Sequence, residues 1–117
     1  MNGFAEIWRL PVPSPEIDDG PETRLKYQVL MLSYSVEGQQ TSIRFERVVA
    51  FCFTDFGACT KDHLVAYDKL VAWGESDWLK QLRSLSHEDL DGARHYRIFI
   101  DEVGAYDVIA RSVELPT

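Results

Sequence analysis

Two cysteines and a neighbouring histidine are the residues whose types could do chemistry, either as metal ligands or as a nucleophile with its base. Six residues separate Cys52 from Cys59, and three separate Cys59 from His63. A structural zinc site usually has four ligands in two closely spaced pairs, and the second pair is missing here. A reactive cysteine also needs a third group that orients the base, and none follows Cys59. We therefore expect no metal site and no cofactor.

Carboxylates are the most numerous chemical groups, with 19 in the chain, and most of them lie in loop-like sequence. Solvated carboxylates titrate normally and make poor general acids or bases, because that work needs two groups whose environments differ. The seven glycines are scattered singly and form no phosphate-binding loop. The sequence therefore predicts no catalytic residue.

Two acidic pairs and one tryptophan are candidates for contact with a partner instead. Asp101 and Glu102 lie at the predicted tip of a β-hairpin, while Glu75 and Asp77 lie at the predicted start of a helix. Trp73 directly precedes a glycine before that helix, where an aromatic side chain can stay exposed. Aromatic residues are enriched at interface hot spots, and charged tips are accessible. These five residues form the predicted partner-binding site.

The net charge of −7, from 12 basic and 19 acidic residues, predicts an acidic surface. Such a surface repels the phosphates of nucleic acids and of anionic lipids, and the basic residues do not cluster. We therefore expect no nucleic-acid or membrane contact, and a protein partner that has a basic surface. The longest apolar run, Val48–Phe53, is too short for a membrane span, and the chain starts without a secretory leader. A cytoplasmic location with both cysteines reduced is the expectation.

The clearest structural element is a C-terminal β-hairpin. Two runs rich in aromatic and β-branched residues, His95–Ile100 and Ala105–Leu115, flank an acidic turn. Gly104 is predicted to take the left-handed position of a three-residue loop. A helix is predicted at about 76–86, with Ser76 as its N-cap and an apolar stripe of Trp78, Leu79, Leu82 and Leu85.

Strands are also predicted over 4–10, 24–36, 42–54 and about 69–73, with a proline-rich surface loop over 11–22. The apolar parity switches in the middle of 24–36, which indicates either a strand covered on both faces or a bulge. The strands 24–36 and 42–54 should pair antiparallel as a hairpin. In 42–54, Val49 is placed on the apolar face, and a bulge is predicted near Arg47, which interrupts that face.

The order of these elements predicts an α+β fold. We expect an antiparallel sheet of about four to six strands, with one main helix packed on one face. A chain of 117 residues is about one domain, so 1–117 is predicted to be a single globular domain.

Two segments, Ala66–Leu79 and His95–Ala110, resemble a group of small bacterial single-domain proteins without assigned biochemistry. Those proteins share a Ser-x-Trp-Leu helix start, then a His-Tyr/Phe-x-Ile strand, an acidic turn with glycine, and a closing Tyr-x-Val-Ile-Ala strand. All four motifs are present here. The resemblance implies structural roles for these motifs and carries no catalytic residues. Small acidic proteins of similar type often serve as cytoplasmic antidotes to bacterial toxins.

The leading hypothesis is a non-enzymatic protein-binding module, an immunity protein that neutralises a basic bacterial toxin. Complementary charge would speed association and mask the active site of the toxin. One alternative is a small-molecule-binding domain, or a small enzyme, with a helix–sheet pocket lined by residues such as Tyr67, His95 and Arg97. The other alternative is a homodimer built through an exposed edge strand.

Overall fold

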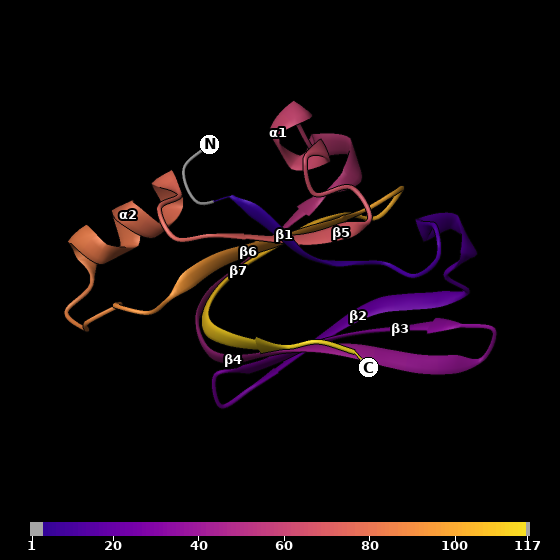
Figure 1. Ribbon diagram of the computed structural model, residues 1–117, viewed down its shortest axis with the longest axis horizontal. Helices are drawn as coiled ribbons and strands as arrows, with labels where there is room; N and C mark the ends of the chain where they lie inside the picture. The colour runs from indigo at the N-terminus through magenta and orange to yellow at the C-terminus, as the bar shows by residue number, and fades with distance from the viewer. Residues whose placement is uncertain (1–3, 117) are drawn as a thin grey trace.

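The computed structural model describes residues 4–116 and shows one seven-stranded antiparallel sheet with two helices (Figure 1). The elements are β1 (Ala5–Arg9), β2 (Asp19–Lys26), β3 (Val29–Val36), β4 (Gln39–Asp55), α1 (Lys61–Leu64), β5 (Lys69–Trp73), α2 (Asp77–Leu85), β6 (Arg94–Ile100) and β7 (Gly104–Glu114). The strand order is β1-β5-β6-β7-β4-β3-β2. The predicted α+β class and antiparallel sheet are confirmed, whereas the predicted four to six strands are too few.

The predicted strand 24–36 is in fact two strands joined by a turn. Tyr27 and Gln28 have φ angles of 51° and 68° and connect β2 to β3, which pair antiparallel. A two-residue turn with positive φ at both positions normally contains Asn or Gly, and neither residue is present to signal it. The switch in apolar parity marks this turn. Both predicted explanations of the switch, a strand covered on both faces and a bulge, were therefore wrong. β2 also begins at Asp19, inside the segment predicted as a loop over 11–22.

β4 and β7 bend strongly, so the sheet folds over into two layers (Figure 1). β1, β5 and β6 lie in one layer, and β2 and β3 lie in the other. A bulge in β4 accompanies the bend: Arg47 has a φ of 54°, and the pairing with β7 shifts register between Val48 and Ala50. The bulge predicted near Arg47 is confirmed. It turns Val48 into the core and leaves Val49 37% exposed, so the predicted place of Val49 on the apolar face was wrong.

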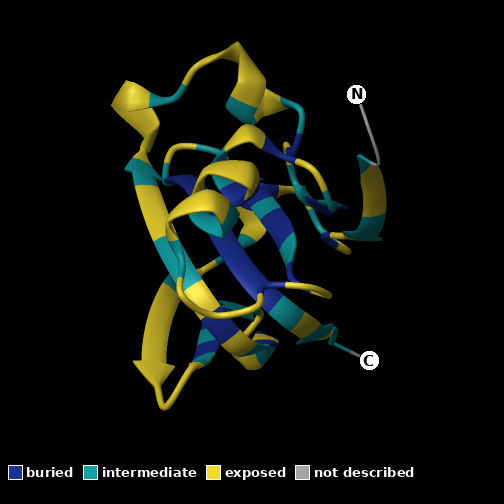
Figure 2. Ribbon diagram, turned by 90° about the vertical axis from the view of Figure 1, so that its left-hand side faces the viewer, coloured by how far each residue is buried: buried dark blue, intermediate teal, exposed yellow. Residues whose placement is uncertain are grey.

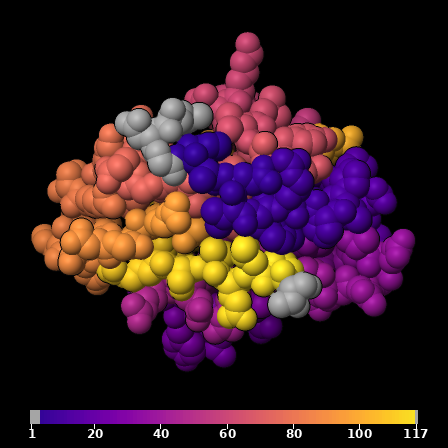
Figure 3. Space-filling model, viewed as in Figure 1, coloured from indigo at the N-terminus to yellow at the C-terminus, as the bar shows by residue number. Residues whose placement is uncertain are grey.

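The main core lies between the two layers, where inward-facing side chains of both meet. It includes Leu30, Leu32, Ile43, Phe45, Leu70, Tyr96, Ile98 and Val108. Figure 2 shows the buried strands as a continuous strip inside the molecule, with exposed residues on the helices and at the sheet edge. Leu10 and Ile17 pack on this core, and Figure 3 shows the N-terminal segment lying directly beside the last strand on one side of the fold.

Two helices cover the outer face of β5, β6 and β7. α2 buries Leu79 completely against Leu90, Ala93 and Ile109, and its N-cap Ser76 accepts a hydrogen bond from the Leu79 amide at 3.1 Å. The predicted helix at 76–86 and its packing on one face are therefore confirmed. Its stripe ends early, because Leu85 is 70% exposed. α1 lies in the segment before β5 and was not predicted. No helix within the described part of the chain is long and apolar enough to cross a membrane.

β6 and β7 form the predicted C-terminal hairpin, but the role of its glycine differs. The left-handed residue of the turn is Glu102, with a φ of 64°. Gly104 begins β7 with a φ of 144°, and a Cβ at this position would overlap the carbonyl oxygen of Thr54 in β4. The glycine is therefore needed for the close approach of two strands rather than for the turn.

Candidate functional site

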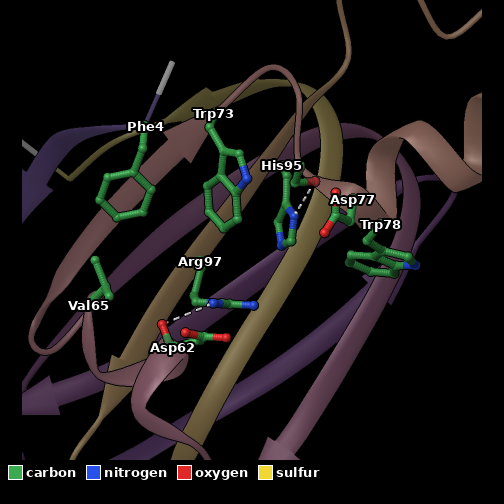
Figure 4. A pocket seen from close by; sticks show the side chains of 9 residues that line it. Phe4, Asp62, Val65, Trp73, Asp77, Trp78, His95 and Arg97 are labelled. Atoms are coloured by element: carbon green, nitrogen blue, oxygen red, sulfur yellow. Dashed lines mark hydrogen bonds between the residues drawn. The ribbon is translucent and has the colours of Figure 1, made fainter. Parts of the chain in front are cut away.

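A hollow of about 290 Å³ lies on the outer face of β5 and β6, between α1 and α2 (Figure 4). Its walls are aromatic on two sides, and its rim carries carboxylates. The residues that line it are Phe4, Asp62, Val65, Trp73, Ser76, Asp77, Trp78, His95 and Arg97. We call it the α1–α2 hollow.

Strand alternation places the floor of the hollow. Successive side chains of a strand point to opposite faces, so His95 and Arg97 share the outer face of β6. Antiparallel pairing sets Trp73 of β5 opposite His95, and Asp107 of β7 opposite Arg97. Side chains from three strands therefore meet on the outer face of the sheet: Trp73, His95, Arg97 and Asp107. The opposite face of these strands belongs to the apolar core.

His95 is only 3% exposed and joins two polar partners. Its Nδ1 lies 2.7 Å from the Ser76 Oγ, and its Nε2 lies 2.6 Å from Oδ1 of Asp107. A neutral imidazole satisfies both contacts when Nε2 donates to Asp107 and Nδ1 accepts from the Ser76 hydroxyl. Arg97 Nε donates to the same Asp107 oxygen at 2.6 Å, which balances the buried carboxylate with a cation. This network leaves His95 without an unsatisfied ring nitrogen.

Aromatic rings hold the imidazole in place. The Trp73 ring stacks on the His95 ring with centroids 4.1 Å apart and planes at 20°, and Trp78 meets the same ring edge-on at 5.2 Å. Phe4 packs against Trp73 at 5.3 Å, and the Arg97 guanidinium carbon lies 5.4 Å from the Trp73 centroid. These contacts make the walls of the hollow rigid and apolar.

The rim of the hollow is negatively charged. The carboxylates of Asp62 and Asp77 are exposed and form no ion pair with any residue in 4–116. The charge of Arg97 is balanced by Asp107, and its Nη1 donates to the Asp62 backbone carbonyl at 3.2 Å. Two uncompensated carboxylates beside aromatic walls favour a cationic occupant.

Ser76, His95 and Asp107 are connected in the order of a nucleophile, a base and an orienting acid. Three features oppose that role. Ser76 is 6% exposed, its Oγ already accepts the helix-capping bond from Leu79, and Arg97 neutralises the carboxylate that would strengthen the base. The arrangement is therefore better suited to building a wall than to attacking a substrate.

The five predicted partner-binding residues lie in two separate places. Trp73 and Asp77 line the α1–α2 hollow, and Glu75 lies beside it, paired with Arg83 at 2.9 Å. The β6–β7 turn, which holds Asp101 and Glu102, is at the opposite end of β6. The structure thus brings three of the five residues together and leaves the other two elsewhere.

In the β6–β7 turn, Asp101 is half-buried and forms hydrogen bonds with two other segments of the chain, at Ser14 and Tyr67. Its amide donates to the Ser14 Oγ at 3.2 Å, and its carboxylate accepts from the Tyr67 hydroxyl at 3.0 Å. The bond to Asp101 raises the pKa of Tyr67. Of the two predicted contact residues here, only Glu102 is fully available to a partner.

The helix–sheet pocket that was considered as an alternative is present in part. His95 and Arg97 line the α1–α2 hollow, as that alternative requires, but Tyr67 does not. The Tyr67 ring packs on Phe99 instead, with centroids 5.7 Å apart.

The cysteines and His63 serve local structure. His63 Nδ1 accepts from the Thr60 amide at 2.9 Å, within the capping box of α1, and the Cys59 thiol donates to the Thr54 carbonyl at 3.5 Å. Burial raises the pKa of the Cys59 thiol, which lowers its thiolate fraction at neutral pH. Cys52 is exposed. Across residues 4–116, no group of three or more His, Cys, Asp or Glu side chains could hold a metal ion.

Sequence reasoning missed Asp62 and Asp107. The signal for Asp107 is a single acidic residue within the otherwise apolar run Ala105–Ala110, all of which is buried. A buried charge in a strand requires a partner, which directs attention to the basic residues of the neighbouring strand. Asp62 has no such signal, because it lies among the polar residues of a short helix. Comparison with known protein families, with curated proteins and with solved structures finds no match for this chain.

Proposed function

We propose that the protein is a non-enzymatic binding module that holds a basic segment of a partner protein in the α1–α2 hollow. The observation that carries this proposal is the pairing of two uncompensated carboxylates, Asp62 and Asp77, with rigid aromatic walls around one small space. Carboxylates attract a lysine or arginine side chain, and the face of an aromatic ring adds a cation–π interaction.

The size of the hollow supports a protein side chain as the occupant. Pockets for drug-sized ligands measure about 300–1,000 Å³, and this one, at about 290 Å³, lies at the lower limit. One or two side chains from a partner surface fit such a space. The surrounding acidic surface would then steer the partner during association.

In its most specific form, the proposal is that the partner is a basic bacterial toxin and that the protein acts as its immunity protein in the cytoplasm. The net charge of −7 supports a basic partner, and both cysteines are free, as a reducing compartment requires. Co-expression with the product of the gene directly upstream tests this form. A stoichiometric complex that Asp62→Asn with Asp77→Asn weakens would support it, and a neighbour that does not bind would contradict it.

The hollow itself is tested with a defined probe. A capped hexapeptide with two arginines is titrated into the protein, and the fluorescence of Trp73 and Trp78 is followed. We expect Asp62→Asn with Asp77→Asn to weaken binding about tenfold, since two charge-assisted contacts are removed. Glu16→Gln with Glu88→Gln removes the same charge from exposed positions elsewhere and is the matched control. An equal loss in both variants would mean that only bulk charge acts, and the same peptide with citrulline should not bind.

One alternative function has an observation in its favour. The contacts of 2.7 Å and 2.6 Å link Ser76, His95 and Asp107 in the order of a serine hydrolase triad, but with the ring nitrogens exchanged: Nδ1 faces the serine and Nε2 faces the carboxylate. A fluorophosphonate probe distinguishes the two functions, because it labels activated serines covalently. We expect no labelling. Stoichiometric labelling that Ser76→Ala abolishes and Ser84→Ala leaves intact would make the protein an enzyme and overturn the binding proposal.

A further inference from the structure

A second surface of opposite charge lies on the outer face of β2, β3 and β4. A shallow trough of about 430 Å³ is lined there by three cations, Arg24, Lys26 and Arg44, together with Tyr27, Val29 and Met31. The lining residues carry no carboxylate, but Arg44 forms an exposed pair with Glu46 at 3.5 Å and lies opposite Glu114 of β7, so Arg24 and Lys26 are the lining cations without an ion pair among residues 4–116. We call it the β2–β4 trough. It faces away from the α1–α2 hollow, because the two outer faces belong to opposite layers of the folded sheet (Figure 1).

Strand register assembles the trough. Arg24 of β2 lies opposite Met31 of β3, and Met31 lies opposite Arg44 of β4. Side chains in facing positions of an antiparallel sheet point to the same side, so two arginines flank one methionine. Lys26 faces Val29 in the neighbouring row. Three of the 12 basic residues therefore lie close together here, although the sequence shows no basic cluster.

The turn beside the trough presents a fixed aromatic residue. Tyr27 is 88% exposed, the most exposed large apolar side chain recorded in the structure, and Lys26 Nζ lies 5.5 Å from its ring centroid. The next carbonyl, that of Gln28, accepts a 2.7 Å hydrogen bond from the Val48 amide at the β4 bulge. Tyr27 and Gln28 both have positive φ, the backbone geometry of a two-residue hairpin turn, which fixes where the Tyr27 side chain projects.

We propose that the β2–β4 trough binds an extended acidic segment of a partner protein, as an interaction surface separate from the α1–α2 hollow. Arg24 and Lys26 favour carboxylates on the partner, and the exposed Arg44 can exchange Glu46 for one of them. The apolar floor of Val29 and Met31, with Tyr27 beside it, suits the aliphatic stems of the acidic side chains. Among residues 4–116, β2 is the last strand of the sheet, so its edge can pair with an added strand whose acidic residues point to the trough while the apolar residues between them point to the other face.

Other occupants fit these observations less well. Three cations would neutralise about three phosphates, too few to hold a nucleic acid or an anionic membrane against a net charge of −7. A second copy of the chain that paired symmetrically through β2 would bring Arg24 and Lys26 close to their own copies. Like charges that face each other across strands are destabilising. The charge pattern therefore favours an acidic protein segment.

The test uses the complete protein and a capped ten-residue peptide in which glutamate alternates with valine and serine. Isothermal titration measures affinity, and amide chemical shifts locate the contact. We expect shifts confined to β2, β3, their turn and the part of β4 around Arg44, and an affinity that falls as salt rises. Arg24→Glu with Arg44→Glu should weaken binding about tenfold or more, because both changes replace attraction with repulsion. All substituted residues are exposed, and an unchanged urea midpoint confirms that folding is intact.

Lys61→Glu with Lys80→Glu is the matched control, since it makes the same change in net charge at exposed positions outside the trough. We expect it to weaken binding less than about threefold. An equal loss in both variants, equal binding of the glutamine version of the peptide, or no binding to the wild-type protein would overturn the proposal. Tighter binding of a ten-base oligothymidine, or of vesicles with anionic lipid, would overturn it as well.

Discussion

The two outer faces of the folded sheet each carry an arginine–carboxylate pair, and the pairs differ sharply. Arg97 and Asp107 lie 2.6 Å apart with side chains 16% and 6% exposed. Arg44 and Glu46 lie 3.5 Å apart with side chains 44% and 41% exposed. The strands around both pairs belong to one sheet, but only the first face is covered by helices.

This difference shows what the helices contribute to the site. α1 and α2 remove Asp107 and His95 from water, so each polar group there needs a defined partner, and the side chains become rigid. On the uncovered face, Arg44 stays solvated, loses little when it changes partners, and is free to contact another protein. The α1–α2 hollow is thus a preformed site, whereas the β2–β4 trough depends mainly on charge.

The largest effect is expected for Asp107→Ala. It leaves the partly buried Arg97 and the Nε2 of His95 without their acceptor, so the free energy of unfolding should fall by about 3 kcal/mol. Glu46→Ala removes the carboxylate of the exposed pair and should change it by less than about 0.5 kcal/mol. Urea unfolding of both variants checks the comparison. Similar losses for the two would show that the helices do not set the difference.

A smaller difference in stability loss is expected between one serine on the helix-covered face and one on the uncovered face. Ser76→Ala removes the N-cap of α2 and the partner of His95, which should cost about 1.5 kcal/mol of stability. Ser33→Ala breaks only a 2.8 Å contact with the Ser42 hydroxyl, on the uncovered face, and should cost about 0.5 kcal/mol. Thermal unfolding distinguishes these values. A larger loss for Ser33→Ala would contradict the view that the covered face is the more strongly ordered one.

Tyr34 lies in the core shared by the two layers, and its substitution should increase stability. Its buried hydroxyl has no hydrogen-bond partner among residues 4–116, so Tyr34→Phe should raise the free energy of unfolding by about 1 kcal/mol. Burial also raises the pKa of Tyr34. The unfolded chain ionises first, so wild-type stability falls as the pH rises above the ordinary phenol value of about 10.

The phenylalanine variant lacks this contribution and should lose less stability in alkaline solution. Urea unfolding near neutral pH and near pH 10.5 measures the difference, which should grow with pH. Burial raises the pKa of Tyr96 and Tyr106 too, so some alkaline loss remains in the variant. Binding at either outer face should not change. A variant that is less stable at neutral pH would show that the hydroxyl is hydrogen-bonded in solution.

The smallest expected effect on stability comes from a double substitution in the turn beside the β2–β4 trough, which should change stability and binding in opposite directions. Tyr27→Asn with Gln28→Gly introduces the residues that a turn with two positive φ angles prefers, so stability should rise by about 0.5 kcal/mol. The same change removes the exposed aromatic ring and should weaken binding of the acidic peptide. Binding of the arginine peptide at the α1–α2 hollow is the internal control. A variant that binds both peptides as the wild type does would remove Tyr27 from the proposed surface.

Elements with strong local signals could be predicted from the sequence. The helix after Ser76 has a capping residue and an apolar stripe, and the bulge near Arg47 is marked by a charge on an apolar face. The turn at Tyr27 and Gln28 could not be predicted, because neither residue favours positive φ. Its conformation depends on the pairing of the flanking strands and on the hydrogen bond from Val48.

The two sites likewise combine features that the sequence predicts with features that it does not. Alternation along β6 and β7 by itself determined that His95 and Arg97 share a face, because side chains in a strand repeat every second residue. It also placed Asp107 within an apolar strand, where a charge needs a partner. Only the tertiary structure decided that Asp107 lies opposite Arg97, that Ser76 reaches His95, and that distant basic residues line one trough. Those contacts depend on strand register and on how α2 packs over the sheet, which arise from the burial of side chains far apart in the chain.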